Sequence, residues 1–288
     1  MLSERAARAA QEQYREEGYA VIRGFLDPDE VAEVQAETRR IYAEGLTHHA
    51  TYRHGNLCYE ILPESAFGAR YMVQAYWIAW VSETFERLRR SPGYYALLGG
   101  LLGPDIRQIA QQIHWKPPGA RLSGYRFHQD LRFRDKGEAA QVAEATVTTG
   151  LAIDRATREN GCLQVVPGSH RRGYLGLSDD GSIMKGATAE DELRAVGINP
   201  SDIVALEMQP GDLAVWGLLT VHGSAHNTSA HDRAFAISSY VRADATTRGE
   251  WAFRGGVSQP LGDAPVLCKY DKLFEAPGPL YDTTEWWR

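Results

Sequence analysis

A histidine and an aspartate that could bind a metal ion lie two positions apart in the segment "YRFHQD". In an extended chain alternate side chains point to the same side, so the imidazole of His128 and the carboxylate of Asp130 would converge on one point. Two histidines and one carboxylate form the facial triad of non-haem iron oxygenases, which leaves positions open on the metal. The pair therefore predicts two members of such a triad, although the same spacing also occurs in ordinary polar loops.

Three further histidines occur in the segment 221–233, "VHGSAHNTSAHDR". His222 and His226 are four positions apart, which on a helix would make a zinc-type pair. The Gly, Ser, Asn and Thr residues around them favour a turn over a helix. We therefore expect a strand that ends near His222 and holds it rigidly, and then a polar connection that carries His226 and His231 at the surface or beside a substrate.

An arginine, Arg233, begins the next apolar run, "RAFAISSYV". A guanidinium group that enters a barrel-like core needs an anionic partner, because it stays protonated there. Its planar set of donors suits a carboxylate. Near an iron site that carboxylate could belong to a dicarboxylate cosubstrate, and the alternative partner is an Asp or Glu of the protein itself.

The secondary structure that we expect around these residues changes along the chain, from helices to strands. The first hundred residues are rich in helix formers, and one helix has a clear start, with Asp27 as its N-cap and Pro28 at its first position. From about residue 105, short apolar runs separated by turn residues predict strands, and 213–223, "LAVWGLLTVHG", is one of them. A small helix over 186–197 interrupts the series.

Many short strands that follow several helices indicate a mainly β sandwich or barrel with flanking helices. No linker divides the chain, so we predict a single domain over 1–288. Its parts are a mostly helical segment packed on the core (1–104), the β core (105–243) and a C-terminal extension (244–288).

Composition restricts the class of protein. The chain has 288 residues, a net charge of -6 and 43% hydrophobic residues, so neither a nucleic acid nor an anionic membrane is indicated as a partner. The charged N-terminus and the lack of a long apolar run predict neither a signal peptide nor a membrane span. Three widely spaced cysteines, Cys58, Cys162 and Cys268, are typical of free thiols in a reducing cytoplasm. We expect a cytoplasmic enzyme with a small-molecule substrate, and composition leaves its oligomeric state open.

An ordered series of motifs resembles the phytanoyl-CoA dioxygenase family of iron(II)- and 2-oxoglutarate-dependent oxygenases. It runs from "GYAVIRGFLDPDEV" through "KPPG", "FHQD", "ENGCLQVVPGSH" and "QPGDLAVW" to "HGSAHNTSAHDRAFAISSY", and covers about residues 14–243. The resemblance implies a double-stranded β-helix core, which is a jelly roll of the cupin-like kind, with helices outside. It also implies Fe(II), 2-oxoglutarate and dioxygen as cofactors.

The resemblance assigns roles to individual residues. The implied iron ligands are His128, Asp130 and His222. The distal carboxylate of 2-oxoglutarate would bind Arg233 and Ser224, and Gln112 would line the same pocket. Candidate substrate contacts are Tyr125, Arg126, His226 and His114.

Two positions bear on the reaction and on the pocket. Halogenating relatives lack the carboxylate that Asp130 supplies here, so its presence favours hydroxylation. Relatives often carry a tryptophan where this chain has Gly150, and the glycine would leave extra room in the pocket.

The leading hypothesis is a dioxygenase that hydroxylates an unactivated C–H bond in natural-product or acid metabolism, with release of succinate and CO2. The same chemistry supports desaturation, ring closure or epoxidation. One alternative is a non-oxidative metal-dependent β-barrel enzyme, an isomerase or a hydrolase that uses the same three ligands. The other is a catalytically inactive binding module, against which the intact ligand set and Arg233 argue.

Overall fold

A computed structural model of the chain describes residues 2–118, 124–134, 137, 139–178, 183–184, 188–266 and 278–283. Cys268 and the first two residues of the helix expected over 186–197 lie outside these ranges. The α-helices are α1 (Glu4–Glu17), α2 (Pro28–Gly45), α3 (Glu64–Phe67), α4 (Glu83–Leu88), α5 (Pro92–Leu102), α6 (Ala139–Val142) and α7 (Glu190–Ala195). Short 3-10 helices are η1 (Ile78–Trp80), η2 (Asp130–Phe133), η3 (Ser169–Arg172), η4 (Pro200–Asp202) and η5 (Ala243–Ala245).

The described strands form two sheets. Those of the large sheet are β1 (Tyr19–Ile22), β2 (Thr51–His54), β3 (Leu57–Leu62), β4 (Tyr71–Tyr76), β5 (Ile106–Trp115), β7 (Thr146–Ala152), β10 (Leu213–Gly217), β12 (Ala234–Arg242), β13 (Glu250–Arg254), β14 (Val257–Ser258) and β15 (Leu280–Asp282). Those of the small sheet, in spatial order, are β6 (Tyr125–His128), β11 (His222–Ser224), β8 (Gln164–Val165) and β9 (Val204–Ala205).

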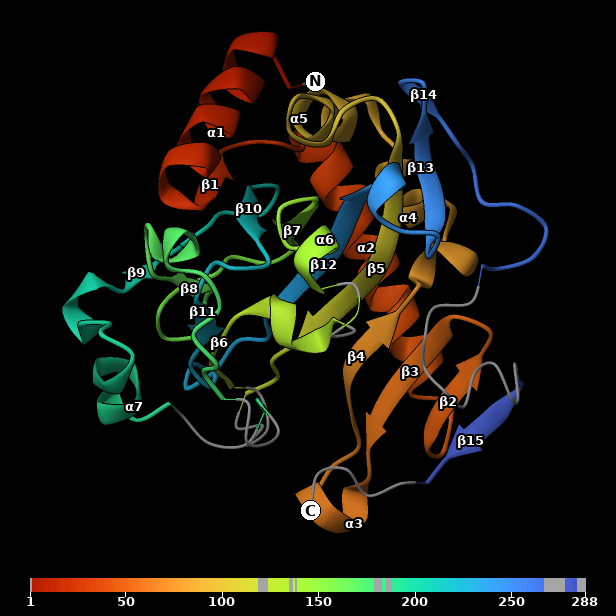
Figure 1. The fold of residues 1–288 in the computed structure, drawn as a ribbon. Helices are drawn as coiled ribbons and strands as arrows, with labels where there is room; N and C mark the ends of the chain where they lie inside the picture. Colours follow the sequence, from red (N-terminus) through yellow and green to blue (C-terminus); the bar gives the residue numbers. More distant parts are fainter. Residues whose placement is uncertain are drawn as a thin grey trace.

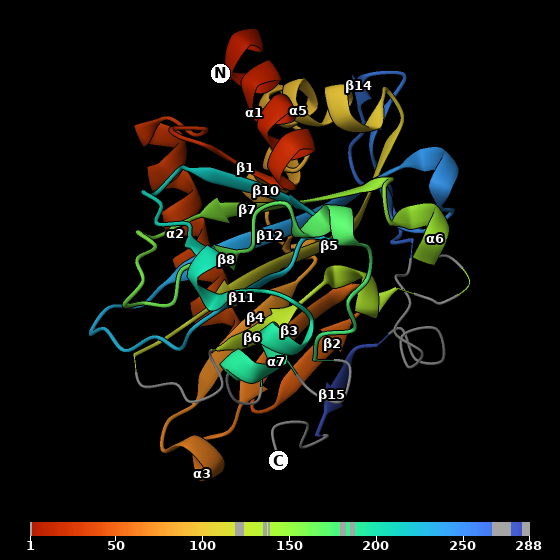
Figure 2. The same ribbon diagram turned by 60° about the vertical axis from the view of Figure 1, so that its left-hand side comes forward.

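The large sheet has the order β1-β10-β7-β12-β5-β4-β3-β2-β15, with β13 beside β5. All of its described pairings are antiparallel, so polar turns can join its strands. The small sheet lies against one side of it (Figures 1 and 2). This arrangement is a double-stranded β-helix, so the fold that the motifs implied is confirmed.

Strand periodicity divides the core into two layers. In β10, Leu213 and Val215 pack with α2 and α5 in the outer core, whereas Ala214 and Trp216 face the small sheet.

The start of α2 is fixed by hydrogen bonds between neighbouring residues. The Asp27 side chain accepts hydrogen bonds from the first turn of α2 and the Glu30 side chain accepts one from the Asp27 backbone, a complete capping box.

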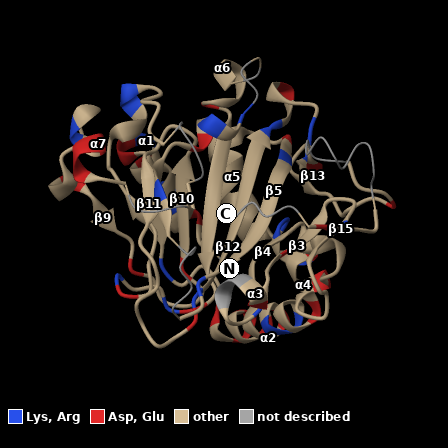
Figure 3. Ribbon diagram, turned by 90° about the horizontal axis from the view of Figure 1, so that it is seen from below, with Lys and Arg blue, Asp and Glu red and all other residues tan. Residues whose placement is uncertain are grey.

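Charged side chains lie on the outer surface of the molecule. In Figure 3 both signs are interspersed along α2 and α4. Ion pairs such as Arg40–Glu37 (2.7 Å) and Arg87–Glu33 (2.6 Å) account for part of this pattern. Within the described ranges, no helix combines the length and the apolar composition that crossing a membrane requires.

The mostly helical N-terminal segment also supplies four strands of the large sheet, of which β2, β3 and β4 were not predicted. The segment after residue 243 supplies β13, β14 and β15. The large sheet therefore draws strands from all three predicted parts of the chain. The single domain and its division at residues 104 and 243 remain predictions.

The run 213–223 is not one strand, as we had expected, but two strands in different sheets. β10 ends at Gly217, the chain turns at Thr220, and β11 begins at His222. The Thr220 backbone N–H donates to the carbonyl of Gly217 (3.1 Å), and its hydroxyl donates to the carbonyl of Gly18 (2.6 Å). His222 therefore begins a short strand of the small sheet instead of ending a long one.

Candidate metal centre

Three potential metal ligands converge between the two sheets. β6 and β11 are antiparallel neighbours, and His222 lies directly opposite His128. Asp130 follows at the start of η2, and its Oδ1 atom lies 3.5 Å from the Nε2 atom of each histidine. One ligand atom from each of the three residues lies within 4.8 Å of the others. A single ion could span this spacing.

Backbone carbonyls orient both imidazoles. The Nδ1 atom of His128 donates to the carbonyl of Arg126 (2.7 Å), and the Nδ1 atom of His222 donates to the carbonyl of Thr220 (2.9 Å). Because a carbonyl can only accept, each Nδ1 carries a hydrogen, and Nε2 is the nitrogen of each ring that faces Asp130 and could bind a metal. Burial lowers the pKa of His128, and the neighbouring His222 lowers it further, which favours the neutral ligand form.

The carboxylate of Asp130 is held on its other side by an indole. Trp216 Nε1 donates to Oδ2 (3.2 Å), so Oδ1 is the oxygen that faces the histidines. Burial alone would raise the pKa of Asp130, but the facing imidazoles of His222 and His128 together bring it well below its usual value. Two imidazole nitrogens and one anionic carboxylate oxygen fit a divalent iron ion and leave other coordination positions free.

A buried cationic region lies beside the three ligands. Arg233 is 3% exposed, and its Nη2 donates to the carbonyl of Gly161 (2.7 Å). No carboxylate forms an ion pair with it among the residues that the structure describes, and its Nε lacks a partner there. Burial lowers the pKa of Arg233 to about 10, which leaves it charged at neutral pH. Of the two partners considered for Arg233, a protein carboxylate is therefore not found in the described structure.

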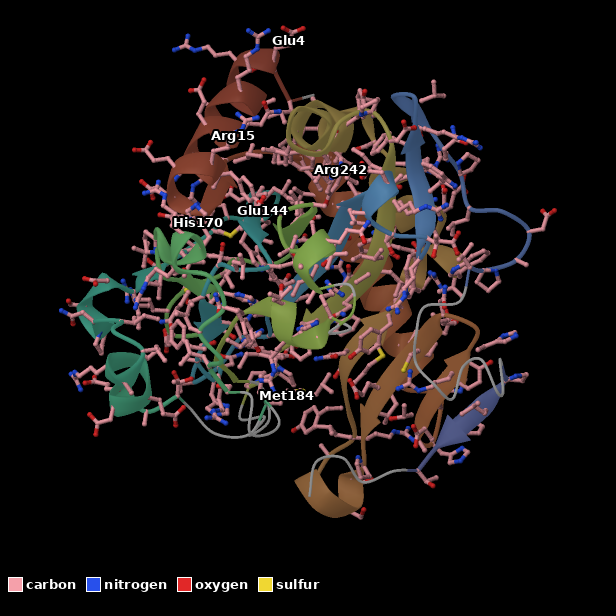
Figure 4. All side chains as sticks on the ribbon, viewed as in Figure 1. Glu4, Arg15, Glu144, His170, Met184 and Arg242 are labelled. Carbon is pink, nitrogen blue, oxygen red and sulfur yellow. The ribbon has the colours of Figure 1, made fainter. Side chains whose placement is uncertain are left out.

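The ligands and this cation face a common cavity of about 510 Å³. Ser224, Gln112, His114 and Tyr125 also line it. Apolar walls come from Trp77, Ile109, Phe133, Val142, Leu163, Ile183, Met184, Phe235 and Ile237. Figure 4 labels Met184, whose sulfur lies 3.9 Å from the Nε2 atom of Gln74. The cavity is therefore largely apolar, with polar groups at defined places.

The imidazole of His114 is held in the wall of this cavity. Its Nε2 donates to Gln112 Oε1 (2.6 Å), and its ring lies 5.2 Å from that of Tyr125. Burial lowers the pKa of His114 to about 3, and the cations Arg233 and Lys116 contribute. His114 is therefore a neutral group in the wall of the pocket.

Two of the predicted substrate residues do not line the cavity. Arg126 pairs with Glu192 of α7 (2.8 Å) and is not among the residues that line the cavity. His226 is half-buried in the connection after β11, beside Gly124. His231, on the same connection, is exposed. The structure thus gathers eight of the ten predicted site residues around the cavity and leaves out Arg126 and His226.

Gly150 does not leave extra room, contrary to our expectation. A Cβ atom at this position would lie 2.5 Å from Phe235 Cζ and 2.9 Å from Trp216 Cζ3. Neighbouring strands β12 and β10 carry these two aromatic rings, and the rings already fill the space. The indole that contacts Asp130 therefore comes from β10, the strand in which Ala214 lies opposite Gly150 of β7.

Several functional candidates were not identified in the sequence. Lys116 is buried behind Ser224, and Trp216 contacts Asp130. Glu60, Gln74 and Tyr76 form a polar edge of the cavity on β3 and β4. Lys116 had a signal, because it opens the "KPPG" motif in a chain with few lysines. Trp216 closes the "QPGDLAVW" motif, but nothing in the sequence places it beside Asp130.

Comparisons with known proteins found a matching family model and several relatives. The family model described as "Phytanoyl-CoA dioxygenase (PhyH)" matches residues 14–235. A probable alpha-ketoglutarate-dependent hypophosphite dioxygenase of Stutzerimonas stutzeri is 24% identical over 238 residues, which are 82% of this chain and 78% of that protein. A methylphosphonate hydroxylase of Gimesia maris is 31% identical over 142 residues, which are 49% of this chain and 48% of that protein.

The fold is shared with solved structures. EctD from S. alaskensis, crystallised with 2-oxoglutarate and 5-hydroxyectoine, superposes with a TM-score of 0.61 at 22% identity. The match covers 89% of this chain and 81% of that one.

Proposed function

The chain belongs to the phytanoyl-CoA dioxygenase family, and on that premise we propose an iron(II)- and 2-oxoglutarate-dependent dioxygenase that hydroxylates a C–H bond of a small organic molecule. Succinate and CO2 are the co-products. The observation that carries this proposal is the convergence of two carbonyl-oriented histidines and one indole-held carboxylate on one point beside a buried arginine.

His128, Asp130 and His222 would hold the metal. When bound, the iron supplies the activation of dioxygen that C–H oxidation requires. The backbone carbonyls and Trp216 keep the three ligand atoms turned inward, so little reorganisation is needed for binding. Asp130 occupies the carboxylate position, which supports hydroxylation.

Arg233 and Ser224 would bind the distal carboxylate of 2-oxoglutarate, and Gln112 would line the same pocket. The guanidinium group can form two parallel hydrogen bonds with a carboxylate. This buried cation also supports a dioxygenase over a zinc hydrolase or isomerase, because it gives a dicarboxylate cosubstrate a defined place. The walls around Trp77, Ile237 and Phe235 would exclude water from the reacting centre.

For the substrate, we assign contacts to Tyr125 and His114, which line the cavity. The polar edge at Glu60, Gln74 and Tyr76 would orient a polar group of an otherwise apolar molecule. In that edge Tyr76 donates to Gln74, and Gln74 Nε2 donates to the hydroxyl of Tyr125 (2.7 Å). A small substrate that combines an apolar skeleton with hydrogen-bonding groups fits these walls.

The test is turnover of 2-oxoglutarate by the purified chain with Fe(II) and dioxygen, measured as succinate formed with and without a panel of small organic substrates. Asp130→Ala should abolish succinate formation, while Asp244→Ala, at an exposed aspartate paired with Arg242, should not change it. Full activity in Asp130→Ala would refute the assigned ligand set. Turnover that needs a metal but neither dioxygen nor 2-oxoglutarate would favour the hydrolase or isomerase.

A further inference from the structure

A single carboxylate interrupts the apolar strand β3 and faces the cavity. The strand reads "LCYEIL", and Glu60 lies between Tyr59 and Ile61, which are both buried in the outer core. Because side chains alternate along a strand, Glu60 points to the opposite side, and it lines the cavity that the proposed metal ligands also line. An acid that is partly withdrawn from water in such a wall is unfavourable unless its charge is compensated.

Glu60 is one end of a row of polar side chains that crosses three strands. It lies opposite Gln74 of β4, and Gln74 lies opposite His114 of β5. Side chains directly opposite each other share a face of the sheet, and all three line the cavity. Since neighbouring strands are about 4.8 Å apart, Glu60 lies roughly 10 Å from His114 along this row. The row therefore leads from the wall beside Tyr125 to a carboxylate on the far side of β4.

The hydrogen bonds along this row leave Glu60 without a strong donor. The Tyr76 hydroxyl donates to Gln74 Oε1 and lies 3.4 Å from Glu60 Oε2, which is beyond the usual range for a hydrogen bond between two oxygen atoms. Arg53 of the neighbouring strand β2 pairs with Asp282 (3.9 Å). Within the described ranges, Tyr76 is the one donor near the carboxylate of Glu60, and no cation forms an ion pair with it.

The charge of Glu60 is therefore poorly compensated. Desolvation raises the pKa of Glu60 to about 7; Arg53 and Tyr76 oppose this effect, and Asp282 adds to it. A ligand with a positive charge and hydrogen-bond donors would stabilise the ionised form. An ammonium group has both, and its contact with a carboxylate is stronger than that of a neutral hydroxyl. The rings of Tyr76 and Tyr125 line the same cavity, and aromatic rings also attract cations.

We propose that Glu60 is a specificity-determining residue that binds an ammonium group of the substrate, so that the enzyme oxidises a small amine with a mainly apolar skeleton. Arg134 and Arg248 also line the cavity and could attract an anion instead. Both arginines have interaction partners of their own, whereas Glu60 lacks a strong one, so the amine is favoured. This inference rests on the proposed function, because it assumes that the substrate shares the cavity with the metal and the cosubstrate.

The test measures which polar group the cavity selects. Three small skeletons, hexyl, 2-cyclohexylethyl and 2-phenylethyl, each carry an amine, an alcohol or a carboxylate. Their affinities are measured by anaerobic calorimetry on the protein loaded with Mn(II) and 2-oxoglutarate, at pH 8, where an aliphatic amine is protonated and Glu60 is mostly ionised. We expect wild type to bind at least one amine about 10- to 100-fold more tightly than the matched alcohol, and Glu60→Gln to bring that ratio within about 2-fold of one.

Glu64→Gln is the matched control, because Glu64 is an exposed acid of α3 that does not line the cavity. It should keep the wild-type ratio. A preference for the amine that persists in Glu60→Gln would place the amine elsewhere, for example on the metal, and would overturn the inference. A wild type that binds none of the amines, or that prefers the alcohols or the carboxylates, would overturn it as well.

A second variant and the cosubstrate keep the result interpretable. Should Glu60→Gln not fold, Glu60→Asp keeps the charge but withdraws it by one methylene group, so the ratio of amine to alcohol affinity should fall but stay above one. An unchanged ratio in Glu60→Asp would contradict the inference. A wild type that binds Mn(II) but not 2-oxoglutarate would overturn the proposed function itself, whereas normal 2-oxoglutarate binding without a preference for amines would overturn only the role of Glu60.

Discussion

The indole of Trp216 offers a sharp test of the proposed metal centre. Its Nε1 donates to Asp130 Oδ2 over 3.2 Å, and its ring lies 5.4 Å from that of His222. Trp216→Phe keeps an aromatic ring in the core but removes this donor. The carboxylate then loses the group that turns Oδ1 toward the histidines.

The size of the effect follows from the contact. A hydrogen bond to a charged acceptor contributes about 1.5–3 kcal/mol, and the length of this one places it near the lower end. Partners that orient metal ligands typically change metal affinity by about 10- to 100-fold. We therefore expect Trp216→Phe to weaken Fe(II) binding about 10-fold, which corresponds to about 1.4 kcal/mol.

The assay is anaerobic calorimetric titration of the apo protein with Fe(II). Trp115→Phe is the matched control, because Trp115 is also buried (7% exposed) but packs on Tyr42, away from the ligands. Both variants should lose folding stability, measured by chemical denaturation, and only Trp216→Phe should lose metal affinity. Unchanged Fe(II) affinity in Trp216→Phe would refute the reasoning, as would an equal loss in Trp115→Phe.

Three further predictions concern residues around the cavity. His222→Ala should abolish metal binding in the same titration, and His226→Ala should leave it within about 2-fold of wild type, since His226 lies outside the cavity. Gly150→Ala should lower the free energy of unfolding by about 1–3 kcal/mol through overpacking, and Phe235→Leu should recover part of that loss in the double variant, as read from denaturation curves. Glu60→Gln tests a half-buried acid in the cavity wall whose pKa is raised by desolvation to about 7. The folded state then holds a proton that the unfolded chain releases at lower pH, so wild type loses stability as pH rises from about 4.5 to 7. The stability of Glu60→Gln relative to wild type should therefore increase over that window by at most about 3 kcal/mol, and a pH-independent difference would contradict the assigned burial effect.

Local signals in the sequence predicted much of this structure. The N-cap at Asp27 depends on neighbouring residues alone, and it begins α2 where expected. The two-residue spacing of His128 and Asp130 likewise needs only an extended segment, and the structure brings both side chains to one point.

Features that depend on packing could not be found in this way. Leu218 and Val221, which lie between β10 and β11, are buried and apolar, so the chain reads as one strand across the turn where it changes sheets. Lys116 contacts Ser224 although more than a hundred residues separate them in the sequence, and no local sequence pattern predicts such a contact. The space at Gly150 is filled by rings from two neighbouring strands, which a glycine in one strand cannot reveal.

The proposed ligands all come from the small sheet and the residue pair that follows β6. Its described strands are short, from two residues in β8 and β9 to four in β6, whereas β5 and β12 of the large sheet have ten and nine. Few backbone hydrogen bonds therefore hold this layer, and such segments open more readily than a long central strand. An ion held by His128 and His222 would cross-link β6 to β11, and a cosubstrate at Arg233 would join the small sheet to β12. Loading the site would thus slow amide hydrogen exchange mainly in the small sheet, so that part of the binding free energy is converted into local order of the layer that carries the ligands.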